Sequence, residues 1–204
     1  MTTKNQFSGL ILAFAALALC QCGKKEQNQI HSHFTKADSL RGTYLSLQDS
    51  IHEVWNVMIN DDNKKVAAMR NLLHELELTN ASELETIRKY EERLNQLIQL
   101  RYNQKSMANS DVIEEYDFAS NSMVTELVSL TESRSEFTYN TTLQKLVDEI
   151  LAADQRVNNY REQYDLIAEQ YNNFLENNKS YMKDIEEGKA LDKKPLFQMA
   201  SDSQ

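Results

Sequence analysis

Apolar side chains recur at alternating intervals of three and four residues along most of this chain, and this spacing constrains the fold more than any other feature. The longest uninterrupted series has ten positions: Leu143, Leu146, Ile150, Ala153, Val157, Tyr160, Tyr164, Ile167, Tyr171 and Phe174. Such a series returns to one face of an α-helix and predicts helices that pack against other helices. Beyond residue 23 there are only two glycines and one proline, so turns typical of sheet proteins are not expected. The sequence therefore predicts an all-α protein.

Four helices follow from the breaks in this pattern. The first is expected over residues 36–78, where a stutter of two consecutive four-residue steps carries the apolar stripe past the polar run 61–65. A break near Asp61 is the alternative. Ser82 with Glu85 predicts a capping box at the start of the second helix, Asp111 with Glu114 favours a start for the third, and Asn140 to Thr142 can cap the fourth, expected over 142–175.

Two long and two shorter helices joined by short connections predict an elongated, antiparallel, up-and-down four-helix bundle with coiled-coil-like packing over residues 36–178. The pattern is lost in residues 179–204, where a glycine and a proline predict an irregular C-terminal tail. Residues 23–35 are polar and poorly patterned, and we expect them to form a flexible tether before the bundle.

Residues 1–22 have the features of an export signal. Lys4 precedes an apolar run, residues 7–19, that is too short to span a bilayer. Cys20 and Cys22 follow it and are the only cysteines, which predicts a lipoprotein signal in which one of the two is lipidated. The residues before them are larger than a lipoprotein signal favours. A cleaved secretory signal and an uncleaved short anchor are therefore the alternatives.

Composition and motifs argue against several kinds of chemistry. With 22 basic and 31 acidic residues the chain is acidic, so we do not expect a nucleic-acid partner. His74 and Glu75 begin like a zinc-protease motif, but Leu78 stands where the second histidine would be needed. The Glu-x-x-His pairs of di-iron bundles are missing as well. We therefore expect no metal, no cofactor and no catalytic residue, and predict that the protein is not an enzyme.

Three short motifs resemble the LemA family of bacterial envelope proteins. Trp55 is followed nine residues later by a basic pair, Lys64 and Lys65, and then by an aliphatic segment in which Asn71 and Leu72 match the family. The last helix matches at Asp154, Arg156, Val157, Arg161, Tyr164, Tyr171 and Asn172, and the C-terminal match is Lys194, Pro195, Leu196 and Phe197. The basic pair is lysine where the family has arginine, and Arg70 replaces a proline, so the chain resembles a divergent member.

The resemblance implies a membrane-associated antiparallel helical bundle with no established enzymatic activity, often preceded by a signal or a single anchor. Together with the export signal, it predicts a protein anchored in the bacterial cell envelope with its bundle on the non-cytoplasmic, periplasmic side. Whether the inner or the outer membrane holds the anchor is left open, as is the oligomeric state.

Four residues of the predicted first helix are candidates for contact with anionic headgroups or with an acidic partner: Trp55, Lys64, Lys65 and Arg70. The alternative for the basic residues is pairing with a neighbouring helix, and for Trp55 it is core packing. The tyrosines of the last helix are expected to pack in the core.

The function that fits these observations is a non-enzymatic, membrane-anchored helical module that binds another envelope protein, whose identity the sequence does not reveal. The alternative is a periplasmic carrier or chaperone that holds an apolar ligand or an unfolded client between its helices.

Overall fold

The structure of the protein is a computed structural model, and it describes residues 35–79, 83–185 and 191–197. These residues form five α-helices, and no strand occurs within the described ranges. The prediction of an all-α protein is confirmed. The predicted export signal with Cys20 and Cys22, and the predicted tether except for Thr35, lie outside the described residues. Among the helices that are described, none is both long enough and apolar enough to span a membrane.

The first helix, α1, runs without interruption from Lys36 to Thr79, so the alternative break near Asp61 does not occur. It begins with reciprocal hydrogen bonds: the hydroxyl of Thr35 accepts from the backbone N–H of Asp38 (3.1 Å), and the Asp38 carboxylate accepts from the N–H of Thr35 (2.9 Å). This pair satisfies backbone donors that have no partner within the helix. The chain continues through the polar run because Asp61 finds a partner on another helix.

The other helices are α2 (Leu84–Leu100), α3 (Ser110–Glu132), α4 (Thr141–Asn177) and α5 (Lys179–Ile185). Asn140 caps α4 as predicted, since its side chain accepts from two backbone N–H groups. The prediction for α3 was two residues late: Asn109 is the N-cap and accepts from the N–H of Asp111, because its extended backbone can place the side-chain oxygen over the first turn. Glu83 precedes α2 without a side-chain cap, and Ser82 lies outside the described residues.

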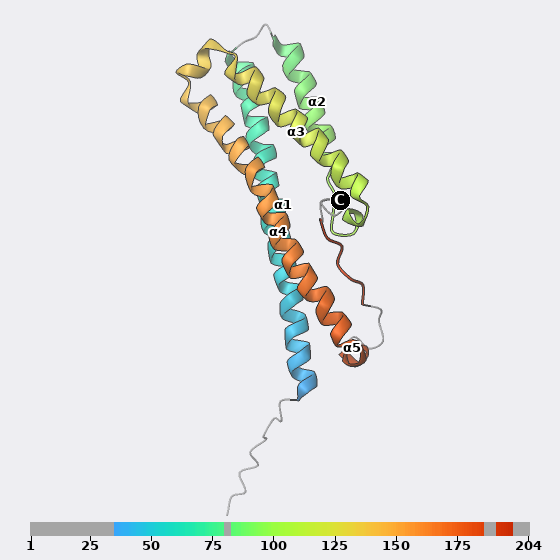
Figure 1. Cartoon of the computed structure of the whole chain (residues 1–204). Coiled ribbons are helices and arrows are strands. Elements are labelled where there is room, and N and C mark those ends of the chain that lie inside the picture. The colour runs from blue at the N-terminus through green and yellow to red at the C-terminus, as the bar shows by residue number, and fades with distance from the viewer. Residues whose placement is uncertain (1–34, 80–82, 186–190, 198–204) are drawn as a thin grey trace, which may run out of the picture. The chain divides into compact units, whose positions relative to one another are not determined.

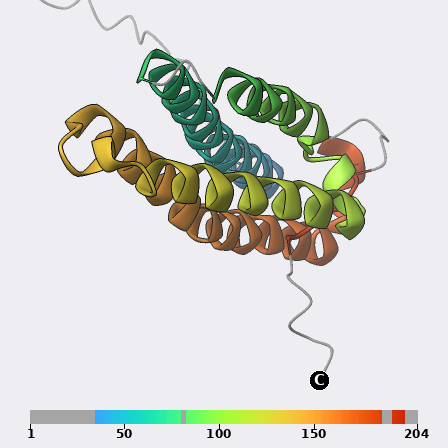
Figure 2. The ribbon, with the colours of Figure 1, turned by 90° about the horizontal axis from the view of Figure 1, so that it is seen from above.

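The longest helices, α1 and α4, lie side by side in opposite directions and make the most extensive helix contact (Figure 1). Helices α2 and α3 pack beside the half of this pair that contains the end of α1 and the start of α4 (Figure 1). Seen from above, α2 lies beside α1 and α3 beside α4 (Figure 2). Within the core, Ile51, Leu73, Leu127, Leu143 and Ile150 are completely buried. The apolar stripes therefore meet as their spacing predicts.

The connection between α2 and α3 includes a short 3-10 turn, Ser106–Ala108, and the one between α3 and α4 another, Ser135–Thr138. Across α2 and α3, Arg93 donates to both carboxylate oxygens of Glu126 (2.5 and 2.8 Å). These hydrogen bonds, together with one from Ser122, lower the pKa of Glu126 to about 2. The shorter helices are thus tied to each other as well as to the long pair.

The predicted irregular tail, residues 179–204, is irregular only in part of its described length, because Lys179–Ile185 forms a helix whereas residues 191–197 have no regular secondary structure. It contains α5, and residues 191–197 then run back beside α4 toward the connection between α2 and α3 (Figure 1). Phe197 ends this stretch with only 3% of its surface exposed. Periodicity misses such a segment because an extended peptide that buries one large side chain has no helical repeat.

Candidate functional site

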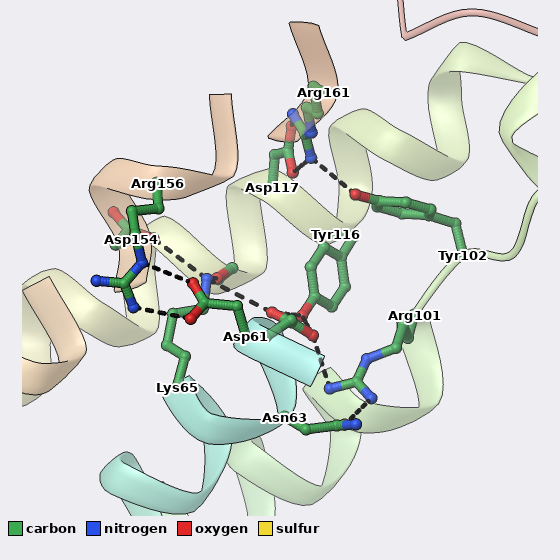
Figure 3. A network of polar contacts seen from close by, with 12 residues as sticks. Asp61, Asn63, Lys65, Arg101, Tyr102, Tyr116, Asp117, Asp154, Arg156 and Arg161 are labelled. Atoms are coloured by element: carbon green, nitrogen blue, oxygen red, sulfur yellow. Dashed lines mark hydrogen bonds and ion pairs between the residues drawn. The ribbon is translucent and has the colours of Figure 1, made fainter. Parts of the chain in front are cut away.

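The middle of α1 carries a polar network whose partners lie on α3, on α4 and at the end of α2. It starts at the stutter, where the apolar stripe crosses polar positions and places acidic side chains inside the fold. Asp61 is 8% exposed and Lys65 is 4% exposed. Figure 3 shows the network, in which partners come from α1, the end of α2, α3 and α4.

Lys65 is the centre of the network. Its ammonium donates to the hydroxyl of Ser120 on α3 (2.9 Å) and to the carboxylate of Asp154 on α4 (3.2 Å), and it lies 3.7 Å from the carboxylate of Asp62. A lysine this deeply buried requires such partners, because an unpaired charge is strongly disfavoured away from water. Lys65 therefore links three helices.

Arg161 of α4 forms a second, equally buried pair. Its guanidinium donates to both carboxylate oxygens of Asp117 on α3 (2.7 and 2.6 Å) and to the hydroxyl of Tyr102 (3.0 Å). Burial by itself would lower the pKa of Arg161, but the hydrogen bonds and the nearby Asp117 and Tyr102 groups raise it above its ordinary value. The planar fork of arginine suits this two-point contact.

Asp62 receives the remaining interior contacts. The hydroxyl of Tyr116 lies 2.8 Å from each of its carboxylate oxygens, and the guanidinium of Arg101 lies 2.7 Å from one of them. Arg101 also donates to the side chain of Asn63 (2.6 Å). Burial and the neighbouring carboxylate raise the pKa of Tyr116 well above its usual range, so its hydroxyl stays protonated as a donor.

At the rim, Arg156 of α4 donates to both carboxylate oxygens of Asp61 (3.1 and 2.8 Å). The network as a whole balances four carboxylates, Asp61, Asp62, Asp117 and Asp154, against four cations, Lys65, Arg101, Arg156 and Arg161. Each of these ion pairs joins residues of different segments. What the arrangement does chemically is hold the helices in register, because every charge already has a partner.

A hollow of about 330 Å³ opens between α3 and α4 beside this network. Lys65 and Arg161 line it, together with Asp117, Asp154 and the amide side chain of Asn158. Its lining suits a small hydrophilic molecule or water better than an apolar ligand. In the part of the chain that the structure describes, no group of three or more histidine, cysteine or acidic side chains is arranged to hold a metal ion.

An aromatic cluster adjoins the network. The Trp55 ring stacks on that of Phe197, with centroids 6.3 Å apart and planes 14° apart, and meets the edge of Tyr164 at 5.6 Å. Burial raises the pKa of Tyr164 to about 12, and its hydroxyl has no hydrogen-bond partner among the described residues. Tyr102 joins the cluster to the network, since its ring contacts Phe197 and its hydroxyl contacts Arg161.

The structure separates the residues that the sequence suggested for contact with headgroups or a partner. Lys65 is buried and lies inside the fold, so the hypothesis of a surface contact does not hold for it; its helical position faces α3 and α4. Lys64 and Arg70 are exposed, and Arg70 donates to Asn95 of α2 (3.2 Å). Trp55 is only partly buried, and its ring stacks against that of Phe197. The basic residues therefore form no single surface cluster.

Sequence reasoning named Asp154 only as a matching position of the LemA resemblance, and it did not identify Asp61, Asp62 or Asp117 as partners of basic residues. A signal was nevertheless present, because Asp62 and Ser120 occupy positions of otherwise apolar stripes. A polar residue on such a stripe is turned toward the core and needs a partner there. The identity of the partner could not be read from the spacing, since it lies on another helix.

Comparison with known proteins adds no relative. No family model matches this chain, and neither a curated protein nor a solved structure shows significant similarity to it.

Proposed function

We propose that this protein is a LemA-like lipoprotein of the bacterial cell envelope, a membrane-anchored, antiparallel four-helix bundle that acts non-enzymatically as a protein-interaction or scaffold module. One observation carries the proposal: the buried charges of the described unit pair with one another across helices. Such pairs disfavour other helix arrangements, in which a buried charge would lose its partner. Because the buried charges are occupied with one another, the outer helix faces are left to a partner.

The LemA resemblance gains support from the way its motifs meet in space. Trp55, in the first motif, stacks on Phe197 of the last. Lys65 of the first pairs with Asp154 of the second, and the side chain of Asn172 binds the backbone of Lys194. Three motifs matched separately along the chain thus belong to one connected set of contacts.

Docking of a partner on the helix faces is supported by large apolar side chains that the fold leaves in solvent. Phe118 of α3 is 79% exposed and Leu166 of α4 is 59% exposed. Aromatic and aliphatic side chains that become buried on association supply much of the binding energy of an interface. These positions, with Lys64, are better crosslinking sites than the buried Lys65.

The test is photocrosslinking in intact cells with a photoreactive residue at Phe118, Leu166 or Lys64, and at the exposed polar position Lys145 of α4 as the matched control. A discrete envelope protein captured from one or more of the first three positions, and not from the control, is the expected result. Equal capture at every position, or turnover of a substrate by the purified protein that depends on Asp154 or Arg161, would overturn the proposal.

The anchor requires its own experiment. Replacing the lipidated cysteine by serine, Cys20→Ser or Cys22→Ser, is expected to move the protein from the membrane fraction to the soluble one. If neither single change does so, the double substitution Cys20→Ser with Cys22→Ser decides between two explanations. Release of the doubly substituted protein would show that either cysteine can be lipidated. Continued membrane association would show that an uncleaved signal segment holds the protein.

The alternative function, carriage of an apolar ligand between the helices, calls for an apolar cavity. The hollow between α3 and α4 has a polar and charged lining instead, so it does not favour this alternative. Binding of an apolar dye by the folded protein would revive it.

A further inference from the structure

The C-terminal segment 191–197 is held against α4 through its backbone. The amide side chain of Asn172 makes two hydrogen bonds to Lys194, accepting from its N–H (2.8 Å) and donating to its carbonyl oxygen (2.9 Å). Farther along, the carboxylate of Asp165 accepts from the N–H of Phe197 (2.8 Å). Contacts of this kind set the register of an extended peptide and do not depend on its side chains.

Side-chain recognition is concentrated on one residue. Phe197 enters a pocket formed by the rings of Trp55, Tyr102 and Tyr164, with ring centroids 5.4–6.3 Å from its own. The guanidinium carbon of Arg161 lies 5.0 Å from the centroid of the Phe197 ring. An aromatic pocket with a cation over the ring face selects an aromatic side chain.

Flanking contacts add a preference for a basic residue three positions earlier. The ammonium of Lys194 lies 5.7 Å from the ring centroid of Tyr171, and Lys193 pairs with Glu176. Pro195 follows, and proline favours the extended backbone that the side chains of α4 bind. Leu196 is partly buried against the core, so the groove reads a pattern of lysine, proline, an aliphatic residue and phenylalanine.

The chain's own segment does not satisfy every polar group at this pocket. The hydroxyl of Tyr164 and the Nε of Arg161 are buried without a hydrogen-bond partner in the described part of the chain. Buried donors without partners weaken the complex that contains them. Because segment 191–197 leaves both groups unpaired, a segment of another protein that matched its pattern and also placed an acceptor beside these groups would bind better.

We propose that this groove is a peptide-docking site, occupied in the isolated protein by its own segment 191–197, and that it binds an extended segment of another protein with the lysine, proline, aliphatic, phenylalanine pattern. The proposal rests on the proposed interaction function and assigns that function a site. The attached segment competes at an effective concentration on the order of millimolar. A partner segment must bind tightly enough to displace segment 191–197, so this segment inhibits binding of the partner.

Trp55 is the single tryptophan of the chain and stacks on Phe197, so its fluorescence reports what occupies the pocket. The probe is a synthetic peptide with the sequence of residues 191–197, capped at both ends, which contains neither tryptophan nor tyrosine. In the full-length variant Phe197→Ala the attached competitor is weakened. We expect the peptide to bind this variant at least about tenfold more tightly than the wild-type protein and to shift Trp55 emission.

Two controls separate recognition from nonspecific association. A peptide with alanine in place of its phenylalanine should bind neither protein. Adding Asn172→Ala to Phe197→Ala should weaken peptide binding about tenfold because two backbone hydrogen bonds are lost. Asn173→Ala, which changes the exposed neighbouring asparagine, should leave it unchanged. If Phe197→Ala loses helical circular dichroism, Phe197→Leu replaces it as the milder variant.

The proposal fails if the peptide binds Phe197→Ala, or the milder variant, no more tightly than the wild-type protein. It also fails if light scattering shows a wild-type dimer that Phe197→Ala converts to a monomer, because the occupant would then be a second copy of this chain. Neither result would affect crosslinks from Phe118 or Leu166, which test the interaction function independently.

Discussion

At the scale of single residues, Lys65 shows that the burial of a charged side chain depends on which side of the helix it occupies. Its sequence neighbour Lys64 is exposed, although the two are chemically identical and adjacent. The difference arises because consecutive helical positions point about 100° apart, so only Lys65 faces Ser120 and Asp154.

This contrast makes a prediction about stability. Lys65→Ala should lower the free energy of unfolding by about 3 kcal/mol, at the low end of the range for breaking a buried ion pair, because Asp154 remains partly solvated. Lys64→Ala is the matched control and should change it by less than about 0.5 kcal/mol. Urea denaturation followed by circular dichroism measures both. Equal effects of the two substitutions would contradict the role assigned to Lys65.

A second residue-scale prediction concerns Tyr164, whose pKa burial raises from 10.0 to about 12. Because the fold favours the neutral phenol, the stability linked to this group is constant below pH 10 and is lost as the pH rises from 10 toward 12. Tyr164→Phe removes this loss and a buried hydroxyl without a partner.

The variant should therefore be at least as stable as the wild-type protein at pH 7, and its advantage should widen above pH 10. Urea denaturation at a series of pH values compares the two, and the other tyrosines cancel in the difference. A variant that is less stable at pH 7 would show that the hydroxyl has a partner after all.

At the scale of the elements, the positions of the long helices could be predicted well and the capping residues at helix starts less well. The apolar alternation located α1 and α4 to within a few residues, because burying a stripe stabilises the whole length of a helix. Asn109 was missed as the cap of α3 because Asp111 and Glu114 fit the same capping pattern. Caps depend on the backbone conformation of one residue, which several nearby polar residues can adopt.

The cap of α4 can be tested directly. Asn140 accepts hydrogen bonds from the N–H groups of Thr142 and Leu143 (3.0 and 3.2 Å), so Asn140→Ala should cost about 1 kcal/mol of stability. Asn159→Ala, at an exposed position inside the same helix, should instead be neutral or slightly stabilising, because alanine is the better helix former. Opposite signs in urea denaturation are the expected outcome, and equal losses would contradict it.

At the scale of the whole described unit, packing is unevenly distributed along α1. Its later part, with Leu72, Leu73 and Leu76 fully buried, lies against α2 and α4, whereas residues 36–39 and 41–43 are exposed. Local opening is governed by the number of buried contacts that must be broken. Stability should therefore rise along α1 from its start toward its end.

Hydrogen exchange followed by mass spectrometry measures this gradient. Backbone amides of residues 66–76 should exchange slowest within α1, and those of residues 40–46 fastest, the first turn of the helix excepted. Phe197→Ala should accelerate exchange around Trp55 while leaving residues 66–76 almost unchanged, since the aromatic cluster lies outside that stretch. Uniform protection along the helix would contradict the gradient.

The sequence by itself determined that the described chain is helical, and where its long helices lie, because apolar periodicity is a local property that each segment carries alone. The same pattern predicted a continuous α1 through its polar middle. Only the tertiary structure decided which charges meet, that Lys65 is buried among Ser120, Asp154 and Asp62, and that Phe197 completes an aromatic pocket. Apart from the contact between Lys65 and Asp62 within α1, these contacts join residues tens of positions apart, and their energy depends on the distance and burial that arise when the helices pack.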